Sequence, residues 1–200
     1  MRDLLSEYQS LYAGGTAVGR AVVTSVWGSA PRPEGACLLA TADGRIAGSI
    51  SGGCVESAAA AEIAEAIIRG TPRLVTYGVS HEKAWEVGLA CGGTIKVWIE
   101  PTVPAPILAA ARGEGGVVVA TVLKSGGAMI LREDSTWEAD PADRWLADAV
   151  KEPAAAALRK EASATIDVAA PDGTTVSVFL EVFPRRPKLV IFGGVHIAMA

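Results

Sequence analysis

The chain has 200 residues, of which 50% are hydrophobic and 20% are charged, and its formal net charge is −4. This length is sufficient for one sizeable hydrophobic core, alone or with a small appendage, and the composition argues against a disordered chain. Because nucleic-acid binding needs a concentrated basic face, which this slightly acidic chain lacks, we expect no nucleic-acid partner.

The N-terminus, the apolar stretches and the cysteines indicate the cellular compartment. Acidic residues begin at Asp3, so the basic and apolar regions of a signal peptide are missing. No stretch approaches the ~18 uninterrupted apolar residues that a membrane helix needs. Three cysteines are too few for a disulfide framework, and each is expected to be a buried small side chain or a reactive thiol. We therefore expect a soluble cytoplasmic protein with no membrane attachment.

The first hundred residues alternate between helical and strand-like patterns. Two prolines and two glycines exclude helix from the segment Gly28–Gly35 and predict a rigid, extended path there. Asp43-Gly44 is typical of a hairpin turn, and Gly70 should end the second helix. The predicted elements are a helix over 3–13, strands over 18–26, 37–41 and 45–50, a helix over 55–69, and strands over 73–79 and 94–100.

The second half of the chain predicts two further hairpins with a helix between them. Asp140-Pro141 is a typical helix start, with Asp as the N-cap and Pro at the first helical position, and Pro153 should kink or restart that helix. The predicted elements are a short helix over 104–112, strands over 115–124 and 128–132, a helix from 140, and strands over 165–169 and 174–183.

The character of the sequence changes at Pro184-Arg185-Arg186-Pro187, which reads as a short basic hinge. Residues 188–196 are then expected to form a buried strand that runs into a glycine turn, as at the start of a dinucleotide-binding unit. The chain ends at Ala200, before a crossover helix could be completed, and Val195 stands where the second glycine of the turn is usual. We therefore expect no NAD or FAD site in this chain.

These patterns predict an α/β fold made of two parts. Residues 1–183 are expected to form a mixed sheet with flanking helices. Residues 184–200 are expected to form the hinge and the first strand, turn and helix of an incomplete Rossmann-like domain.

Two glycine loops that contain a thiol are the strongest candidates for function. The first, Ser51-Gly52-Gly53-Cys54, lies where a strand runs into a helix, so its backbone N–H groups are expected to point outward from the helix N-terminus. The glycines let a ligand approach the backbone, and the helix end favours a thiolate, which is a better nucleophile and soft-metal ligand. Glu56 is placed to brace the turn by accepting from free N–H groups. The alternative is a packed cysteine beside a tight turn.

The second thiol loop, Cys91-Gly92-Gly93, directly precedes a predicted strand. Two such loops feeding one sheet can converge at its edge; the alternative is a buried cysteine where the strand begins. A third candidate is Arg32, which is held between Pro31 and Pro33 and whose planar fork suits phosphate or carboxylate. The alternative there is a rigid surface corner with a solvated arginine.

The remaining cysteine and the histidines are weaker candidates. Cys37 lies inside a predicted strand and is expected in the core, while His81 and His196 lie in predicted loops or turns. The Cys-x-x-Cys, His-Glu-x-x-His and Walker lysine motifs are all missing, which disfavours a structural zinc, a zincin and a P-loop ATPase.

The order and spacing of three motifs resemble the XdhC/CoxI family, the maturation factors of xanthine dehydrogenase and carbon monoxide dehydrogenase. The resemblance is strong over residues 1–101, weakens through 102–183 and resumes at 188–196, which looks like the start of the family's C-terminal Rossmann-like domain. The motifs are Gly28-Ser29-Ala30-Pro31-Arg32, Gly48 to Glu56, and Gly88-Leu89-Ala90-Cys91-Gly92-Gly93 with Trp98-Ile99-Glu100-Pro101.

The resemblance implies a chaperone that binds the molybdenum cofactor, without turnover of its own. Such a protein holds the new cofactor, assists exchange of an oxo ligand for sulfido and passes the cofactor to an apo molybdenum hydroxylase. A cysteine desulfurase is a further implied partner, and the oligomeric state is left open.

The same resemblance assigns roles to individual residues. Cys54 is implied as the principal cofactor contact and molybdenum ligand, within the loop formed by Ser51, Gly52 and Gly53. Cys91, beside Gly92 and Gly93, is implied as a second thiol. Arg32 is implied as a contact to the phosphate or to the pterin.

Two other functions compete with a chaperone. The first is a thiol-based or nucleotide-dependent oxidoreductase that uses Cys54 and Cys91 as a redox pair. A disulfide would require their Cα atoms to lie within roughly 7 Å, whereas a cofactor cleft would hold them further apart. The second is an interaction domain whose partner supplies the missing part of the Rossmann-like domain.

Overall fold

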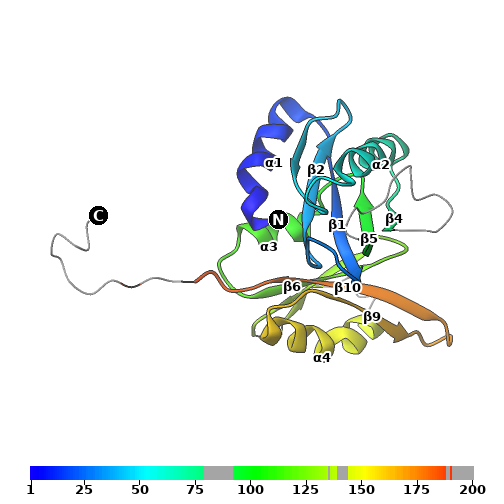
Figure 1. Ribbon diagram of the computed structural model, residues 1–200. Coiled ribbons are helices and arrows are strands. Elements are labelled where there is room, and N and C mark those ends of the chain that lie inside the picture. Colours follow the sequence, from blue (N-terminus) through cyan, green and yellow to red (C-terminus); the bar gives the residue numbers. More distant parts are fainter. Residues whose placement is uncertain (79–91, 135, 139–143, 188–189, 191–200) are drawn as a thin grey trace.

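The strands form two five-stranded sheets, each covered on its outer face by one long helix (Figure 1). The computed structural model describes residues 1–78, 92–134, 136–138, 144–187 and 190. Every strand pairing between these residues is antiparallel. Among them, no helix combines the length and the apolar character needed to cross a bilayer.

The first sheet has the strand order β3-β2-β1-β5-β4. Helix α2 packs its buried side chains, including Ala59, Ile63 and Ala66, on the outer face of this sheet. The elements are α1 (Leu5–Tyr12) with short 3-10 turns on either side, β1 (Val18–Trp27), β2 (Cys37–Thr41), β3 (Ile46–Gly48), α2 (Glu56–Arg69), β4 (Arg73–Gly78) and β5 (Thr94–Glu100).

The second sheet has the strand order β8-β7-β6-β10-β9. Helix α4 covers its outer face with Leu146, Val150 and Ala154 among the buried side chains. The elements are α3 (Ala105–Arg112), β6 (Val117–Val122), β7 (Ala128–Arg132), β8 (Trp137–Glu138), α4 (Arg144–Lys160), β9 (Ala164–Ala169) and β10 (Thr175–Phe183).

The predicted α/β class is confirmed, but the strands divide between two antiparallel sheets and do not form one mixed sheet. Consecutive strands are joined by hairpins in β1-β2-β3, β6-β7-β8 and β9-β10, and a hairpin connection makes strands antiparallel. The helix predicted from 140 is seen from Arg144; its predicted N-cap lies outside the described residues. Of the kink or restart predicted at Pro153, the restart is not found: α4 continues through Pro153, and Val150 and Ala154 on either side are both fully buried.

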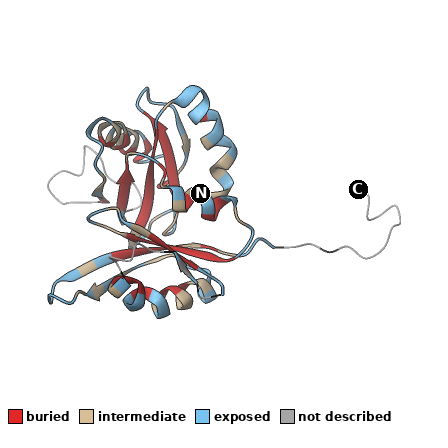
Figure 2. Cartoon of the chain, turned by 180° about the vertical axis from the view of Figure 1, so that it is seen from behind, coloured by how far each residue is buried: buried red, intermediate tan, exposed pale blue. Residues whose placement is uncertain are grey.

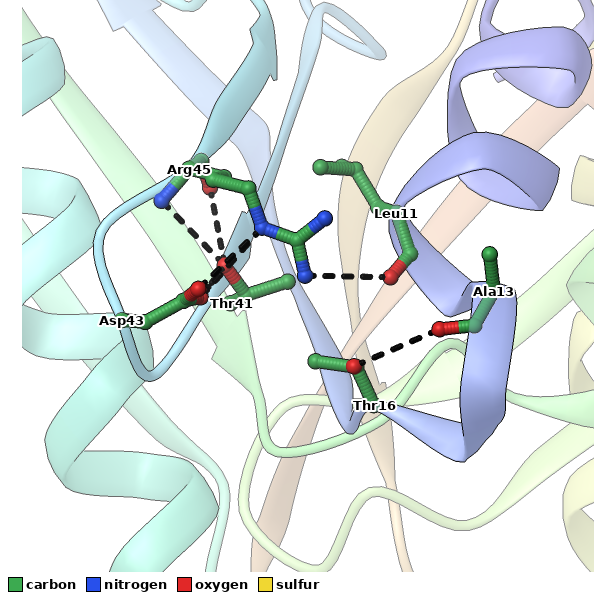
Figure 3. Close-up of polar contacts among 6 residues, drawn as sticks. All are labelled: Leu11, Ala13, Thr16, Thr41, Asp43 and Arg45. Atoms are coloured by element: carbon green, nitrogen blue, oxygen red, sulfur yellow. Dashed lines mark hydrogen bonds and ion pairs between the residues drawn. The ribbon is translucent and has the colours of Figure 1, made fainter.

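The hairpin predicted around Asp43-Gly44 is confirmed, and its turn is fastened to α1 (Figure 3). Gly44 has a φ of 85°. The Thr41 hydroxyl donates to the Asp43 carboxylate and accepts from the Arg45 N–H at 3.2 Å, while Arg45 reaches the Leu11 carbonyl at 3.5 Å. The turn therefore holds the C-terminal end of α1 against the first sheet.

The basic segment 184–187 lies against the loop that follows α3. The Arg186 N–H donates to the Glu114 carbonyl at 3.0 Å, and Arg185 forms an ion pair with Glu133 at 2.6 Å. The Arg2 guanidinium donates to the carbonyls of Pro184 and Gly115. This segment is therefore tied to the residues that precede it in the chain. The strand and turn predicted over 188–196 fall almost wholly outside the described residues.

The inner faces of the two sheets pack against each other, and the strands on both sides of this contact are buried (Figure 2). Val22 of β1, Trp98 of β5 and Phe179 of β10 form its apolar centre, each at most 1% exposed. The two sheets therefore share one interior between them, while α2 and α4 close the two outer faces.

A charged cluster lies within this apolar contact. Arg20 of β1 is fully buried; its Nε donates to Glu100 of β5 at 2.6 Å, and its Nη1 donates to both carboxylate oxygens of Glu181 of β10 at 2.9 and 3.1 Å. One guanidinium thus joins both sheets. Two carboxylates face a single cation, and burial, together with the neighbouring Glu181, raises the pKa of Glu100 despite the attraction of Arg20.

Replacing Arg20 by Met should lower the free energy of unfolding by about 3–5 kcal/mol, because two buried carboxylates would lose their cation. Urea denaturation of the purified variant measures this change. The matched control is Arg69→Met, which removes an exposed arginine paired with Glu65 and should change stability by less than about 0.5 kcal/mol. A similarly small loss in Arg20→Met would show that the buried cluster does not hold the sheets together.

The raised pKa of Glu100 predicts that stability declines as the pH rises. The folded chain binds this proton more tightly than the unfolded chain, so the contribution is complete below the ordinary carboxyl pKa of 4.5 and is lost as the pH rises through the folded value. Glu100→Gln should flatten the fall of unfolding free energy above pH 4.5. Parallel curves for wild type and variant would contradict this assignment.

Candidate functional site

Three loops predicted from the motifs meet at one end of the first sheet. Strand β1 ends at Trp27, which pairs with Thr94 at the start of the antiparallel β5. Strand β2 begins at Cys37, whose carbonyl accepts from the Ser49 N–H at 3.0 Å just after β3 ends. The loop after β1, the loop before β5 and the loop after β3 therefore share this end.

Direct contacts place the Gly28–Gly35 loop between the other two. A Cβ at Gly93 would collide with the Ser29 carbonyl oxygen, so the two backbones approach as closely as only glycine allows. On the other side, a Cβ at Gly52 would lie 3.8 Å from the ring of Pro31. The predicted convergence is therefore found for Gly52 and Gly93, while Cys91 lies outside the described residues.

The Glu56 carboxylate organises the loop that carries Cys54. Its Oε1 accepts from the Ser49 hydroxyl and from the Ile50 and Ser51 N–H groups at 2.7–3.1 Å. Its Oε2 accepts from the Ser51 hydroxyl and from the Gly53 and Val55 N–H groups at 2.5–3.2 Å. Glu56 is 8% exposed. The predicted bracing role of this residue is confirmed, and it is more extensive than a helix cap.

This arrangement corrects the expectation that the backbone N–H groups point outward toward a ligand. The donors of Gly53 and Val55 are taken by Glu56, and the Gly52 N–H donates to the Ser49 hydroxyl at 2.9 Å. The desolvated carboxylate is thus surrounded by hydrogen-bond donors, above all the hydroxyls of Ser51 and Ser49, which hold its pKa down at about 2 despite burial. An internal anion fills the position that a bound anion would occupy.

The group that this loop leaves available to a ligand is therefore the thiol of Cys54. Gly52 and Gly53 have φ values of 76° and 117°, a backbone that favours glycine, and they turn the chain so that Cys54 is exposed. Ser51 is 1% exposed, and its hydroxyl donates to Glu56 and accepts from the Val55 N–H. The structure thus gives Ser51 a part in holding the loop.

The other candidates divide between surface and core. Arg32 is exposed on the loop between the glycine loops. Cys37 is 4% exposed within β2, as expected for a core residue, and burial raises the pKa of its thiol to about 11, which keeps it protonated. His81 and His196 lie outside the described residues.

Sequence reasoning missed the buried cation at the centre of the fold. Arg20 interrupts the apolar strand 18–26, and Glu100 and Glu181 lie in two other strands that read as apolar. A charged residue next to buried apolar residues in each of three strands is the signal that would have predicted an internal ion pair.

Comparisons with known proteins show a matching family model, a curated relative and a solved structure of similar fold. The model of the XdhC and CoxI family matches residues 11–78. Over 88 residues the chain is 40% identical to the molybdenum cofactor insertion chaperone PaoD of Escherichia coli strain K12, a match that covers 44% of this chain and 27% of that protein.

The fold is similar to a crystal structure described as a xanthine dehydrogenase from Bacillus halodurans. The TM-score is 0.59 at 23% identity, over 90% of this chain and 52% of that one, so the likeness concerns the fold alone. The chain thus matches about a quarter of the length of PaoD and about half of the solved structure. Residues 11–78, which carry the Arg32 loop and the Cys54 loop, are thus similar to the XdhC and CoxI family.

Proposed function

We propose that this chain belongs to a maturation factor that binds the molybdenum cofactor and delivers it to a molybdenum hydroxylase. The observation that carries the proposal is the convergence of the Arg32 loop with the two glycine loops, with the Cys54 thiol exposed among them. The 40% identity to a molybdenum cofactor insertion chaperone supports the same cargo.

The chemistry of the site fits this cargo. Molybdenum in the cofactor is thiophilic, and a cysteine thiolate is the soft ligand that suits such a metal. Cys54 would supply that ligand at the rim of the loop, while Gly52 and Gly53 leave room beside it. Because Glu56 satisfies the loop's backbone donors, the loop keeps its shape without cargo and would not need to fold on binding.

The remaining roles form part of the same proposal. The chain would hold the cofactor while an oxo ligand is exchanged for sulfido, with Cys91 as a second thiol and a cysteine desulfurase as a partner. The recipient would be an apo-enzyme of the xanthine dehydrogenase or carbon monoxide dehydrogenase type. We also keep as proposals the division into residues 1–183 and 184–200, a cytoplasmic location and the capacity to self-associate. The competing redox pair requires Cys91, which lies outside the described residues.

Cys54→Ser should abolish most of the bound molybdenum without unfolding the chain, because the side chain is exposed and serine is tolerated at a helix start. The chain is co-expressed with cofactor biosynthesis and purified, and molybdenum and pterin are measured per chain. In the control, Cys54→Ser is combined with Ser57→Cys, which moves the thiol to an exposed position on α2. This double variant should not recover molybdenum. Wild-type molybdenum in Cys54→Ser would contradict the proposal.

Glu56→Gln should weaken both the fold and molybdenum retention, because an amide cannot accept the same set of hydrogen bonds. The loss in unfolding free energy at neutral pH is expected on the order of 1–3 kcal/mol. The folded pKa of Glu56 is about 2, so its stabilisation is present above the ordinary value of 4.5 and is lost as the pH falls through about 2. Denaturation curves of Glu56→Gln should lack this acid dependence.

The matched control for this variant is Glu152→Gln, which changes an exposed carboxylate on α4. It should leave both molybdenum content and acid stability unchanged. Equal behaviour of the two variants would show that the carboxylate of Glu56 does not hold the loop.

A further inference from the structure

A cavity of about 510 Å³ adjoins the loop that carries Cys54, on the side of the second sheet. Its wall includes Arg32 and Glu34 from the loop after β1, Ser49 from the loop after β3, and Glu161 and Ser163 from the turn between α4 and β9. The volume lies within the range of sites for small organic ligands. The turn is in direct reach of the loop, because a Cβ at Gly35 would lie 3.0 Å from the Ser163 hydroxyl.

Ser49 connects this cavity to the thiol loop. Its hydroxyl donates to Glu56 and accepts from the Gly52 N–H, two residues before Cys54, while the residue itself lines the cavity. A ligand that contacts Cys54 at one end could therefore extend past Ser49 into the cavity. The molybdenum cofactor has this extended form, with the metal at one end and an aminopyrimidinone ring at the other.

The charges along the wall decide which part of the cofactor the cavity suits. Three acidic residues, Asp3, Glu34 and Glu161, belong to the wall, against Arg32 and the N-terminal residue Met1. A phosphate would meet three like charges there, which disfavours the phosphate-bearing end. The edge of an aminopyrimidinone instead presents a carbonyl acceptor next to N–H donors, and it needs one donor group and one carboxylate.

Arg32 and Glu34 supply that pair from one rigid segment. Pro31 and Pro33 fix the backbone on both sides of Arg32. Glu34 is half-buried, and its Oε1 accepts from the Val26 N–H at 3.2 Å, so the carboxylate is anchored through one oxygen. Little backbone freedom would be lost on binding, and the Glu34 carboxylate is already held in place, which favours recognition of a planar ring.

Resting on the proposed function, we propose that this cavity binds the pterin end of the cofactor. The Arg32 guanidinium donates to the ring carbonyl, and the Glu34 carboxylate accepts from the amino group and the adjacent ring N–H. The cavity thereby distinguishes a ring that carries the amino group from one that lacks it, and Cys54 contacts the metal. Of the two roles expected for Arg32, this assigns the pterin contact and not the phosphate contact.

The test measures binding of two metal-free probes to the full chain at pH 7 by fluorescence titration. Pterin carries the amino group, and lumazine carries a carbonyl in its place. Losing a charge-assisted hydrogen bond costs about 10–100-fold in affinity, so wild type should prefer pterin by at least about tenfold. Glu34→Gln keeps the acceptor for Val26 but should reduce that preference to below about threefold. Arg32→Ala should weaken both probes equally, since both retain the carbonyl.

Glu152→Gln, which removes a carboxylate outside the cavity, serves as the control and should bind both probes as wild type does. Equal affinity of wild type for pterin and lumazine, absence of pterin binding, or an unchanged preference in Glu34→Gln would overturn the assignment of the cavity. A wild-type chain that prefers pterin but retains no molybdenum would instead overturn the proposed function and leave the ring site standing.

Discussion

The ion pairs of Arg20 with Glu100 and Glu181 hold together the strands that position everything else. Arg20 and Glu100 are paired residues of β1 and β5, and Glu181 belongs to the second sheet. At the other end of the same two strands, Trp27 pairs with Thr94; the chain leaves β1 into the Arg32 loop and enters β5 from Gly92-Gly93. A shift of this register would separate the two loops, so the buried cluster also fixes the candidate site.

The thiol loop shows how a glycine-rich segment can be rigid. Gly52 and Gly53 permit a backbone that other residues avoid, and the Glu56 carboxylate then binds the donors that this backbone exposes. The interior of the loop is thereby satisfied, and its chemistry lies at its rim, in the exposed Cys54. On our proposal, such a site would select its cargo through a soft ligand and the neighbouring side chains of Arg32 and Glu34, and not through backbone N–H groups.

Local signals were sufficient to predict most elements and the place of Cys54. Glycine turns, proline positions and alternating apolar residues are properties of short segments, which is why the hairpin at Asp43-Gly44 and helix α2 could be predicted. The division into two sheets and the Arg20 cluster depend on which strands pair over long distances, and short segments do not encode that. The sequence places Glu56 at the turn. That its carboxylate accepts from the N–H groups of Gly53 and Val55, and so leaves neither free for a ligand, could be seen only in the three-dimensional structure.

X-ray absorption spectroscopy at the molybdenum edge tests the central claim most directly, since it reports the atoms bound to the metal. In the chain purified with its cargo, we predict a sulfur ligand from Cys54 in addition to the sulfurs of the cofactor. The residual molybdenum that Cys54→Ser retains, concentrated for the same measurement, should lack that sulfur. Identical metal environments in the two samples would contradict the assignment of Cys54 as the metal contact.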